Sequence, residues 1–118
     1  MTIANVLNFA KDAQGTPTYS PATSNTKWNV AYTQNTETHI TLPTDFANYN
    51  VLFSYSSGSN VWIDVTGATS TLPSSASLAP CTNEINPGQR IVPGGTLISM
   101  ISSDSAGGQV GIAAYGIP

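Results

Sequence analysis

The side chains that could carry acid–base chemistry are few and lie far apart in the sequence. A glycosidase needs two carboxyl groups that face each other about 5–10 Å apart across the bond to be cleaved. Each acidic residue of this chain stands alone in a predicted loop or on the polar face of a predicted strand. A solvated role is therefore expected for all of them: Asp12, Glu37, Asp45, Asp64, Glu84 and Asp104.

Metal, nucleophile and phosphate motifs have equally little support. His39 is the only histidine, and its spacing from Cys81 and from the carboxylates is not that of a metal site. Residues 24–27 spell Ser-x-x-Lys without the companion motifs of that site, and Gly-x-Ser-x-Gly is absent. The glycine pairs at 94–95 and 107–108 fit hairpin turns, because no helix or P-loop lysine follows them. We therefore expect no catalytic residue, no cofactor and no metal, and hence no enzyme.

Aromatic side chains are the strongest candidates for contact with another molecule. Strand alternation places Trp62 on the same side as Asp64 and away from Val61 and Ile63. Three interpretations of Trp62 stay open: packing within the domain, contact with a neighbouring subunit, or a platform on which a sugar ring stacks. The candidate interface residues are Tyr19, Trp28, Tyr49 and Trp62.

Alternation of apolar and polar residues predicts the strands that position these side chains. Residues 27–33 and 37–42 each alternate as half-buried strands do. Residues 49–55 and 61–66 are aromatic and β-branched runs joined by a short linker with Gly58, which predicts a β-hairpin. The predicted core residues of these two runs are Val51, Phe53, Tyr55, Val61, Ile63 and Val65.

The second half of the chain adds shorter strands. Residues 67–87 are polar and contain three prolines, which predicts a long connection with one edge strand near residues 77–79. A turn is predicted at residues 93–95, and Gly111 marks a bulge or a close backbone approach. Further strands are predicted at residues 90–92, 96–102 and 109–115. About seven or eight strands with regular turns predict an all-β fold, an antiparallel β-sandwich or jelly-roll-like barrel.

The first 25 residues differ from the rest. Pro17 and Pro21 interrupt them and no period is sustained, which predicts an extended N-terminal arm or a loose first strand over residues 1–25. Within this arm, residues 3–10 fit a short helix or a strand equally well. The β-sandwich domain is predicted over residues 26–118.

Charge and hydropathy exclude several classes of partner. Charged residues make up 8% of the chain, the net charge is −3, and Lys11, Lys27 and Arg90 are far apart, whereas nucleic-acid binding needs clustered basic residues. No apolar run has the length of a membrane-spanning helix, and the first residues lack a signal-peptide pattern. We expect neither nucleic acid nor membrane as a partner. The lone Cys81 excludes an internal disulfide framework and indicates synthesis in a reducing cytosol.

Residues 86–101 read NPGQRIVPGGTLISMI, and residues 108–117 read GQVGIAAYGI. Together with the Ser-, Thr- and Asn-rich composition, these segments resemble small virion structural proteins of tailed bacteriophages. The resemblance implies a head decoration or cement protein, made in the cytoplasm of a bacterial host. It also implies binding to the major capsid protein on the capsid exterior, a homotrimeric state, and stabilisation of the shell.

Two alternatives to decoration remain. One is a fibre, collar or tail component of the same virion, which would differ in copy number and position. The other, from a different class, is a small lectin-like module in which an exposed Trp62 and tyrosines bind glycans.

Overall fold

The computed structural model describes residues 6, 9–11, 14, 17–21, 23–73 and 81–118. All regular structure in these residues is β-strand, as the sequence predicts. The strands are β1 (Phe9–Lys11), β2 (Pro17–Pro21), β3 (Thr26–Tyr32), β4 (Thr38–Thr41), β5 (Asn48–Tyr55), β6 (Trp62–Asp64), β7 (Asn83–Ile85), β8 (Gln89–Pro93), β9 (Leu97–Ile101) and β10 (Gly108–Ile117).

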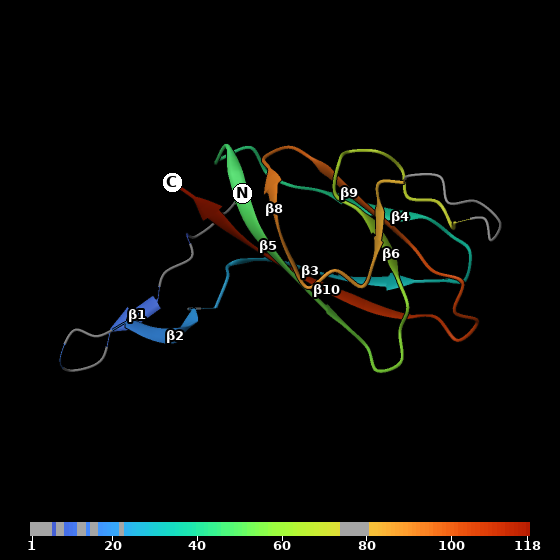
Figure 1. The fold of residues 1–118 in the computed structure, drawn as a ribbon, viewed down its shortest axis with the longest axis horizontal. Helices are drawn as coiled ribbons and strands as arrows, with labels where there is room; N and C mark the ends of the chain where they lie inside the picture. The colour runs from blue at the N-terminus through green and yellow to red at the C-terminus, as the bar shows by residue number, and fades with distance from the viewer. Residues whose placement is uncertain (1–5, 7–8, 12–13, 15–16, 22, 74–80) are drawn as a thin grey trace.

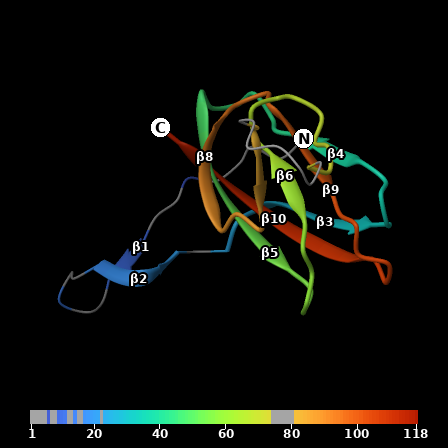
Figure 2. The same cartoon turned by 45° about the vertical axis from the view of Figure 1, so that its right-hand side comes forward.

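Strands β3 to β10 form two four-stranded antiparallel sheets, in the orders β3-β10-β5-β8 and β4-β9-β6-β7 (Figures 1 and 2). We call them sheet 1 and sheet 2. The first of these eight strands pairs with the last, the second with the seventh, the third with the sixth and the fourth with the fifth. This nested pairing is that of a long hairpin rolled up on itself, which is the jelly-roll form of a β-sandwich. The predicted sandwich is confirmed.

The prediction that residues 49–55 and 61–66 form a β-hairpin is wrong. The strands exist, but β5 belongs to sheet 1 and β6 to sheet 2, so they do not pair with each other. Between them Gly58 adopts a positive φ of 77°, and the Ser59 N–H donates to the Ser56 carbonyl oxygen at 3.1 Å. This short turn carries the chain from one sheet to the other. The prediction failed because a Gly-containing linker of this length fits an arch between two sheets as well as a hairpin within one sheet.

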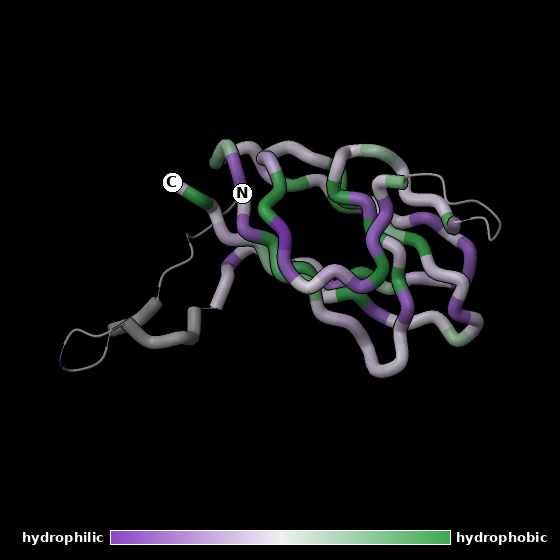
Figure 3. Tube along the Cα trace, viewed as in Figure 1, coloured by the Kyte–Doolittle hydropathy of each residue, from purple (hydrophilic) through white to green (hydrophobic). Residues whose placement is uncertain are grey.

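The core lies between the two sheets and is formed by the side chains that point inward from their strands. Hydrophobic segments lie on strands of both sheets, with hydrophilic segments between them (Figure 3). Of the six predicted core residues, four are buried, while Tyr55 and Val65 are half-buried and pack against the margin of the core. The buried cluster comprises Tyr32, Leu42, Tyr49, Val51, Phe53, Val61, Ile63, Val92, Ile98, Met100, Val110, Ile112 and Ala114.

Other sequence predictions are met in part. The strand predicted at residues 96–102 is found as β9, and it is buried on both faces over most of its length. The edge strand expected near residues 77–79 lies outside the described residues, and β7 is the strand found in that connection. At Gly111 the register continues without a bulge, and a Cβ would lie 2.5 Å from the Ser54 hydroxyl oxygen, so the close approach is what occurs.

Strands β1 and β2 form a separate hairpin. They pair with each other and with no strand of either sheet in the described chain. The hairpin projects from the sandwich body (Figure 1), and the longest dimension of the molecule is 55 Å against 30 and 29 Å for the other two. Outside the hairpin, Val6 forms an isolated parallel bridge with Gly116 near the end of β10. Strand β3 begins at the predicted boundary between arm and domain.

One buried hydroxyl supplies a stability prediction. In the described chain, the Oγ1 atom of Thr38 is the single buried side-chain polar atom without a hydrogen-bond partner. Thr38→Val replaces it with a methyl group of the same shape and should raise the free energy of unfolding by about 1 kcal/mol. Urea denaturation measures the change. Thr41→Val, at an exposed position of the same strand, controls for β-propensity and should leave stability nearly unchanged.

Candidate interaction surfaces

The four predicted interface aromatics lie in different environments. Tyr49 is fully buried with 0% of its surface exposed, so its prediction as an interface residue is corrected: it belongs to the core. Its hydroxyl accepts a hydrogen bond from the Phe46 backbone N–H at 3.3 Å, and the two rings pack edge to face. The side chain of Tyr19, in β2, lies outside the described part of the structure.

Trp62 lies on the outer face of sheet 2. Its neighbour Ile63 points into the core, so alternation directs the half-buried indole outward, as predicted. Across the strand pairs it faces Ile85 of β7, which is 48% exposed, and Ile101 of β9. Trp62 and Ile85 therefore form an apolar pair on this face, available to a protein partner.

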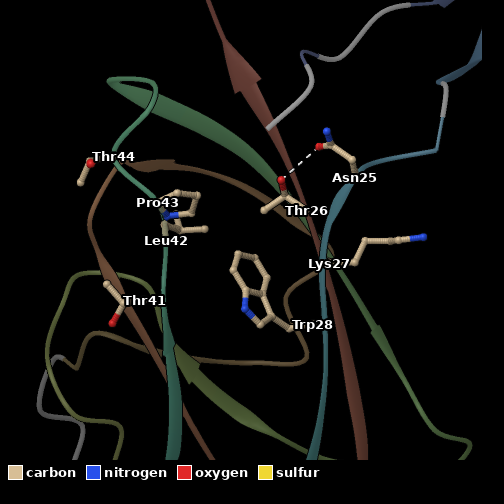
Figure 4. Close-up of a pocket in the computed structure, with 8 residues that line it drawn as sticks. All are labelled: Asn25, Thr26, Lys27, Trp28, Thr41, Leu42, Pro43 and Thr44. Atoms are coloured by element: carbon tan, nitrogen blue, oxygen red, sulfur yellow. Dashed lines mark hydrogen bonds between the residues drawn. The ribbon is translucent and has the colours of Figure 1, made fainter. Parts of the chain in front are cut away.

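Trp28 lies at the side of the sandwich where the outer strands of the two sheets, β3 and β4, run next to each other. A cleft of about 590 Å³ opens there between residues 25–28 and 41–44. Trp28 and Leu42 point toward each other across the cleft, whereas Lys27 extends away from it (Figure 4). The indole N–H of Trp28 is accessible and donates to no described residue.

A second groove, of about 500 Å³, lies on the outer face of sheet 1 between β8, β5 and the end of β10. Gln89 donates from Nε2 to Oδ1 of Asn50 at 2.7 Å on its floor. Ile91, at its rim, is 69% exposed. Sequence reasoning missed this residue, although the fully buried Val92 beside it implies by alternation that Ile91 faces outward.

The single histidine belongs to a polar cluster at the edge of sheet 2. Nδ1 of His39 lies 3.1 Å from Oε2 of Glu37, and the same oxygen accepts a hydrogen bond from Ser99 Oγ at 2.5 Å. The carboxylate therefore stands between the serine and the imidazole, whereas a nucleophilic triad needs the imidazole in the middle to accept the serine proton. The arrangement fastens β4 to β9.

Two other carboxylates fasten loops. Asp104 accepts hydrogen bonds from the Asn60 backbone N–H at 2.8 Å and the Tyr32 hydroxyl at 3.0 Å, and these bonds lower the pKa of Asp104. Asp64 is 1% exposed and accepts from the Thr66 N–H at 2.8 Å, the Thr66 hydroxyl and the Thr82 hydroxyl. Burial alone would raise the pKa of Asp64, but these hydrogen bonds outweigh it and lower the pKa.

The lowered pKa of Asp64 predicts acid sensitivity. Because the carboxyl group binds its proton less readily in the folded chain, its stabilisation is complete above the ordinary pKa of 3.8 and is lost as the pH falls through the folded value. Asp64→Asn should cost about 1.5 kcal/mol of unfolding free energy at pH 7 and much less at pH 2.5. Urea denaturation at both pH values checks this. Asp45→Asn, at an exposed position, makes the same charge change without that loss.

No protein-family model, curated protein or solved structure matches the chain. Among the described residues, no three histidine, cysteine, aspartate or glutamate side chains are grouped to hold a metal ion. The described part of the chain also holds no helix of the length and apolarity that crossing a membrane requires. The candidate surfaces for contact with another molecule described above are the cleft beside Trp28, the groove beside Ile91 and the Trp62–Ile85 pair.

Proposed function

We propose that this chain is a virion structural protein, a head decoration protein that binds the outer surface of a phage capsid through the major capsid protein. The observation that carries the proposal is the β1–β2 hairpin, which stands apart from a compact jelly roll and pairs with neither of its sheets in the described chain. A strand pair held outside its own domain is suited to adding to the sheet edge of a neighbour.

The surface of the body supports the same role. Charged residues are 8% of the sequence, and two large apolar side chains, Ile85 and Ile91, are well exposed. Apolar side chains on a weakly charged surface favour contact with protein and give little attraction to packaged nucleic acid. The jelly roll itself hosts both viral coat and lectin domains, so its support is analogy at the level of the fold.

Decoration would stabilise a shell by mass action. A protein that binds the assembled capsid and not its free subunits favours the assembled state by an amount that grows with its concentration. Simultaneous contacts by the hairpin and by one apolar face give the bound copy two attachments, and the second forms at a high effective concentration. The same contacts would serve a fibre, collar or tail component, which differs in copy number.

Quantitative mass spectrometry of purified virions tests this function. The chain should be present in a fixed ratio to the major capsid protein and should label the shell in immuno-electron microscopy. A few copies confined to the tail would assign the fibre, collar or tail role instead. Virions that lack the chain would refute both.

The Trp28 cleft favours a second candidate function, glycan binding. An indole with an accessible N–H, beside Thr26 and Thr44, offers a stacking surface and hydroxyl groups to a neutral sugar. Saturable binding on a glycan array that is abolished by Trp28→Phe would support this function. Loss on Trp62→Ala alone would place a sugar on the outer face of sheet 2, and no binding to any glycan would exclude it.

A further inference from the structure

The four outer strands of the sandwich are not equally protected against pairing with another chain. Strand β7 has three residues and β4 has four. Strand β8 ends in Pro93, and its Arg90 donates to both carboxylate oxygens of Glu84, which ties β8 to β7. Short strands, prolines and charges of this kind normally prevent the edge of one sheet from pairing with the edge of another.

Strand β3 has almost none of these devices. It is seven residues long, contains no proline, and keeps an unbroken register with β10 from end to end. Lys27 is its single charged residue. No described strand pairs with its outer edge. A long, regular and open edge strand of this kind is a template for a further strand.

The hydrogen bonds of β10 show which backbone groups are free. The Ser56 N–H donates to the carbonyl oxygen of Gln109 at 3.0 Å, so Gln109 directs its backbone toward β5. Alternate residues of a strand face opposite neighbours, so Val110, Ile112 and Ala114 face β3. Their register partners on β3 are Val30, Trp28 and Thr26. The residues between these partners therefore direct their N–H and C=O groups outward: Lys27, Asn29 and Ala31.

We propose that two copies of this chain pair through β3, antiparallel about a two-fold axis at Asn29, so that their sheets 1 form one continuous eight-stranded sheet. In this register Asn29 faces its own symmetry mate, and Lys27 faces the Ala31 of the second copy. Each of these facing pairs exchanges two main-chain hydrogen bonds. All three outward-facing residues of β3 are then paired.

Charge disfavours the neighbouring register, in which the two-fold axis lies at Lys27. Placing the axis at Lys27 would set two ammonium groups opposite each other, which destabilises a strand pair. With the axis at Asn29 no like charges face, and the two amide side chains can hydrogen-bond to each other across the axis. The net charge of −3 on each copy opposes their association weakly.

The same register gives Trp28 a partner. Its position pairs with Val30 of the second copy in the closer, non-hydrogen-bonded arrangement, and both side chains are half-buried on the inner face of sheet 1. Aromatic and β-branched residues form favourable cross-strand pairs. Dimerisation would therefore cover apolar surface beside the open cleft. Because the contact is isologous, it produces a dimer, in contrast to the trimer that the phage resemblance implies.

Light scattering over a range of concentrations tests the pairing with the full chain and two variants. Asn29→Pro blocks the free edge without removing an internal hydrogen bond, since the Asn29 N–H points outward. Asn29→Lys sets like charges across the axis. Each should raise the dimer dissociation constant by roughly 100-fold or more. Asn48→Lys makes the same change on the exposed outer face of β5 and should leave the dimer intact.

Hydrogen exchange of the wild-type chain identifies the surface directly. The amide hydrogens of Lys27, Asn29 and Ala31 should be protected at concentrations where the dimer is formed and should exchange rapidly on dilution. A monomer at high concentration, a trimer, or a dimer in which these three amides exchange rapidly would each overturn the proposal. The proposal would also be overturned if Asn29→Pro and Asn29→Lys both melted at the wild-type temperature and both still formed the dimer.

Discussion

Gly94→Ala is expected to lower the free energy of unfolding by roughly 3 kcal/mol. A Cβ at this position would overlap the carbonyl oxygen of Phe46 and would lie 3.2 Å from that of Pro43 and 3.3 Å from the ring of Tyr49. Two of these three neighbours are backbone atoms, so no side-chain rotation relieves the contact. The Gly94 N–H also donates to the Ala47 carbonyl oxygen at 2.8 Å, which fixes the two loops at this distance.

Gly88→Ala is the matched control for this substitution. A Cβ there meets nothing within 4 Å, and the glycine does not have a positive φ. The change should be neutral or stabilise by about 0.5 kcal/mol, because alanine restricts the unfolded chain. Urea denaturation of both variants measures the difference. Equal stabilities for the two variants would mean that residues 43–47 do not pack against the turn at residues 93–95 as described.

Local alternation was sufficient to predict most strands. The pattern at Trp28, Val30 and Tyr32 reappears as the alternating burial of β3, and the turn at residues 93–95 forms where the glycines predict it. Alternation encodes which side chains enter the core, because burial of one sheet face is a property of each strand separately. It therefore gives the fold class and much of the core.

Strand pairing was not accessible in the same way. Strand β5 pairs with β10 and β8, which lie far from it in the sequence, and not with its neighbour β6. Two consecutive strands and a short glycine turn look alike whether the chain returns in the same sheet or crosses to the other. The jelly-roll order, and with it the open edge at β3, depends on contacts between distant segments.

The candidate interface shows the same division. Tyr49 has the sequence parity of Val51 and Phe53, so alternation already placed it with the core, and its aromatic character was the misleading criterion. Ile91 was missed because an aliphatic residue is expected in the core. Alternation from the fully buried Val92 beside it marks Ile91 as exposed. Which backbone groups of β3 are free depends only on its pairing with β10. The residue types of β3 therefore give no indication of them.

The two sides of the sandwich differ in a way that bears on assembly. On one side the Arg90–Glu84 ion pair, with Nη2 of Arg90 2.7 Å from Oε1 of Glu84, joins the outer strands of the two sheets. On the other side β3 and β4 leave a cleft that Trp28 partly fills. Asn25 and Thr26 line this cleft, so the chain enters β3 on the open side.

Tyr49→Ala should cost roughly 4 kcal/mol of unfolding free energy, which is much of the stability of a domain of this size. The ring is fully buried, packs edge to face on Phe46 with centroids 5.9 Å apart, and lies against the turn at Gly94. Its removal leaves a cavity that the two sheets cannot close. Tyr49→Phe keeps the ring and loses one long hydrogen bond to the Phe46 N–H, so it should cost about 1 kcal/mol or less.

Thermal denaturation and light scattering of the two Tyr49 variants separate a core role from an interface role. A core residue lowers the melting temperature and leaves the mass of the folded protein unchanged, whereas an interface residue changes the mass and leaves the melting of the isolated chain near the wild-type value. The opposite pair of results is expected for Asn29→Lys. Should Tyr49→Ala melt like the wild type, the burial of this ring between the sheets would be contradicted, and with it the close contact that makes Gly94 irreplaceable.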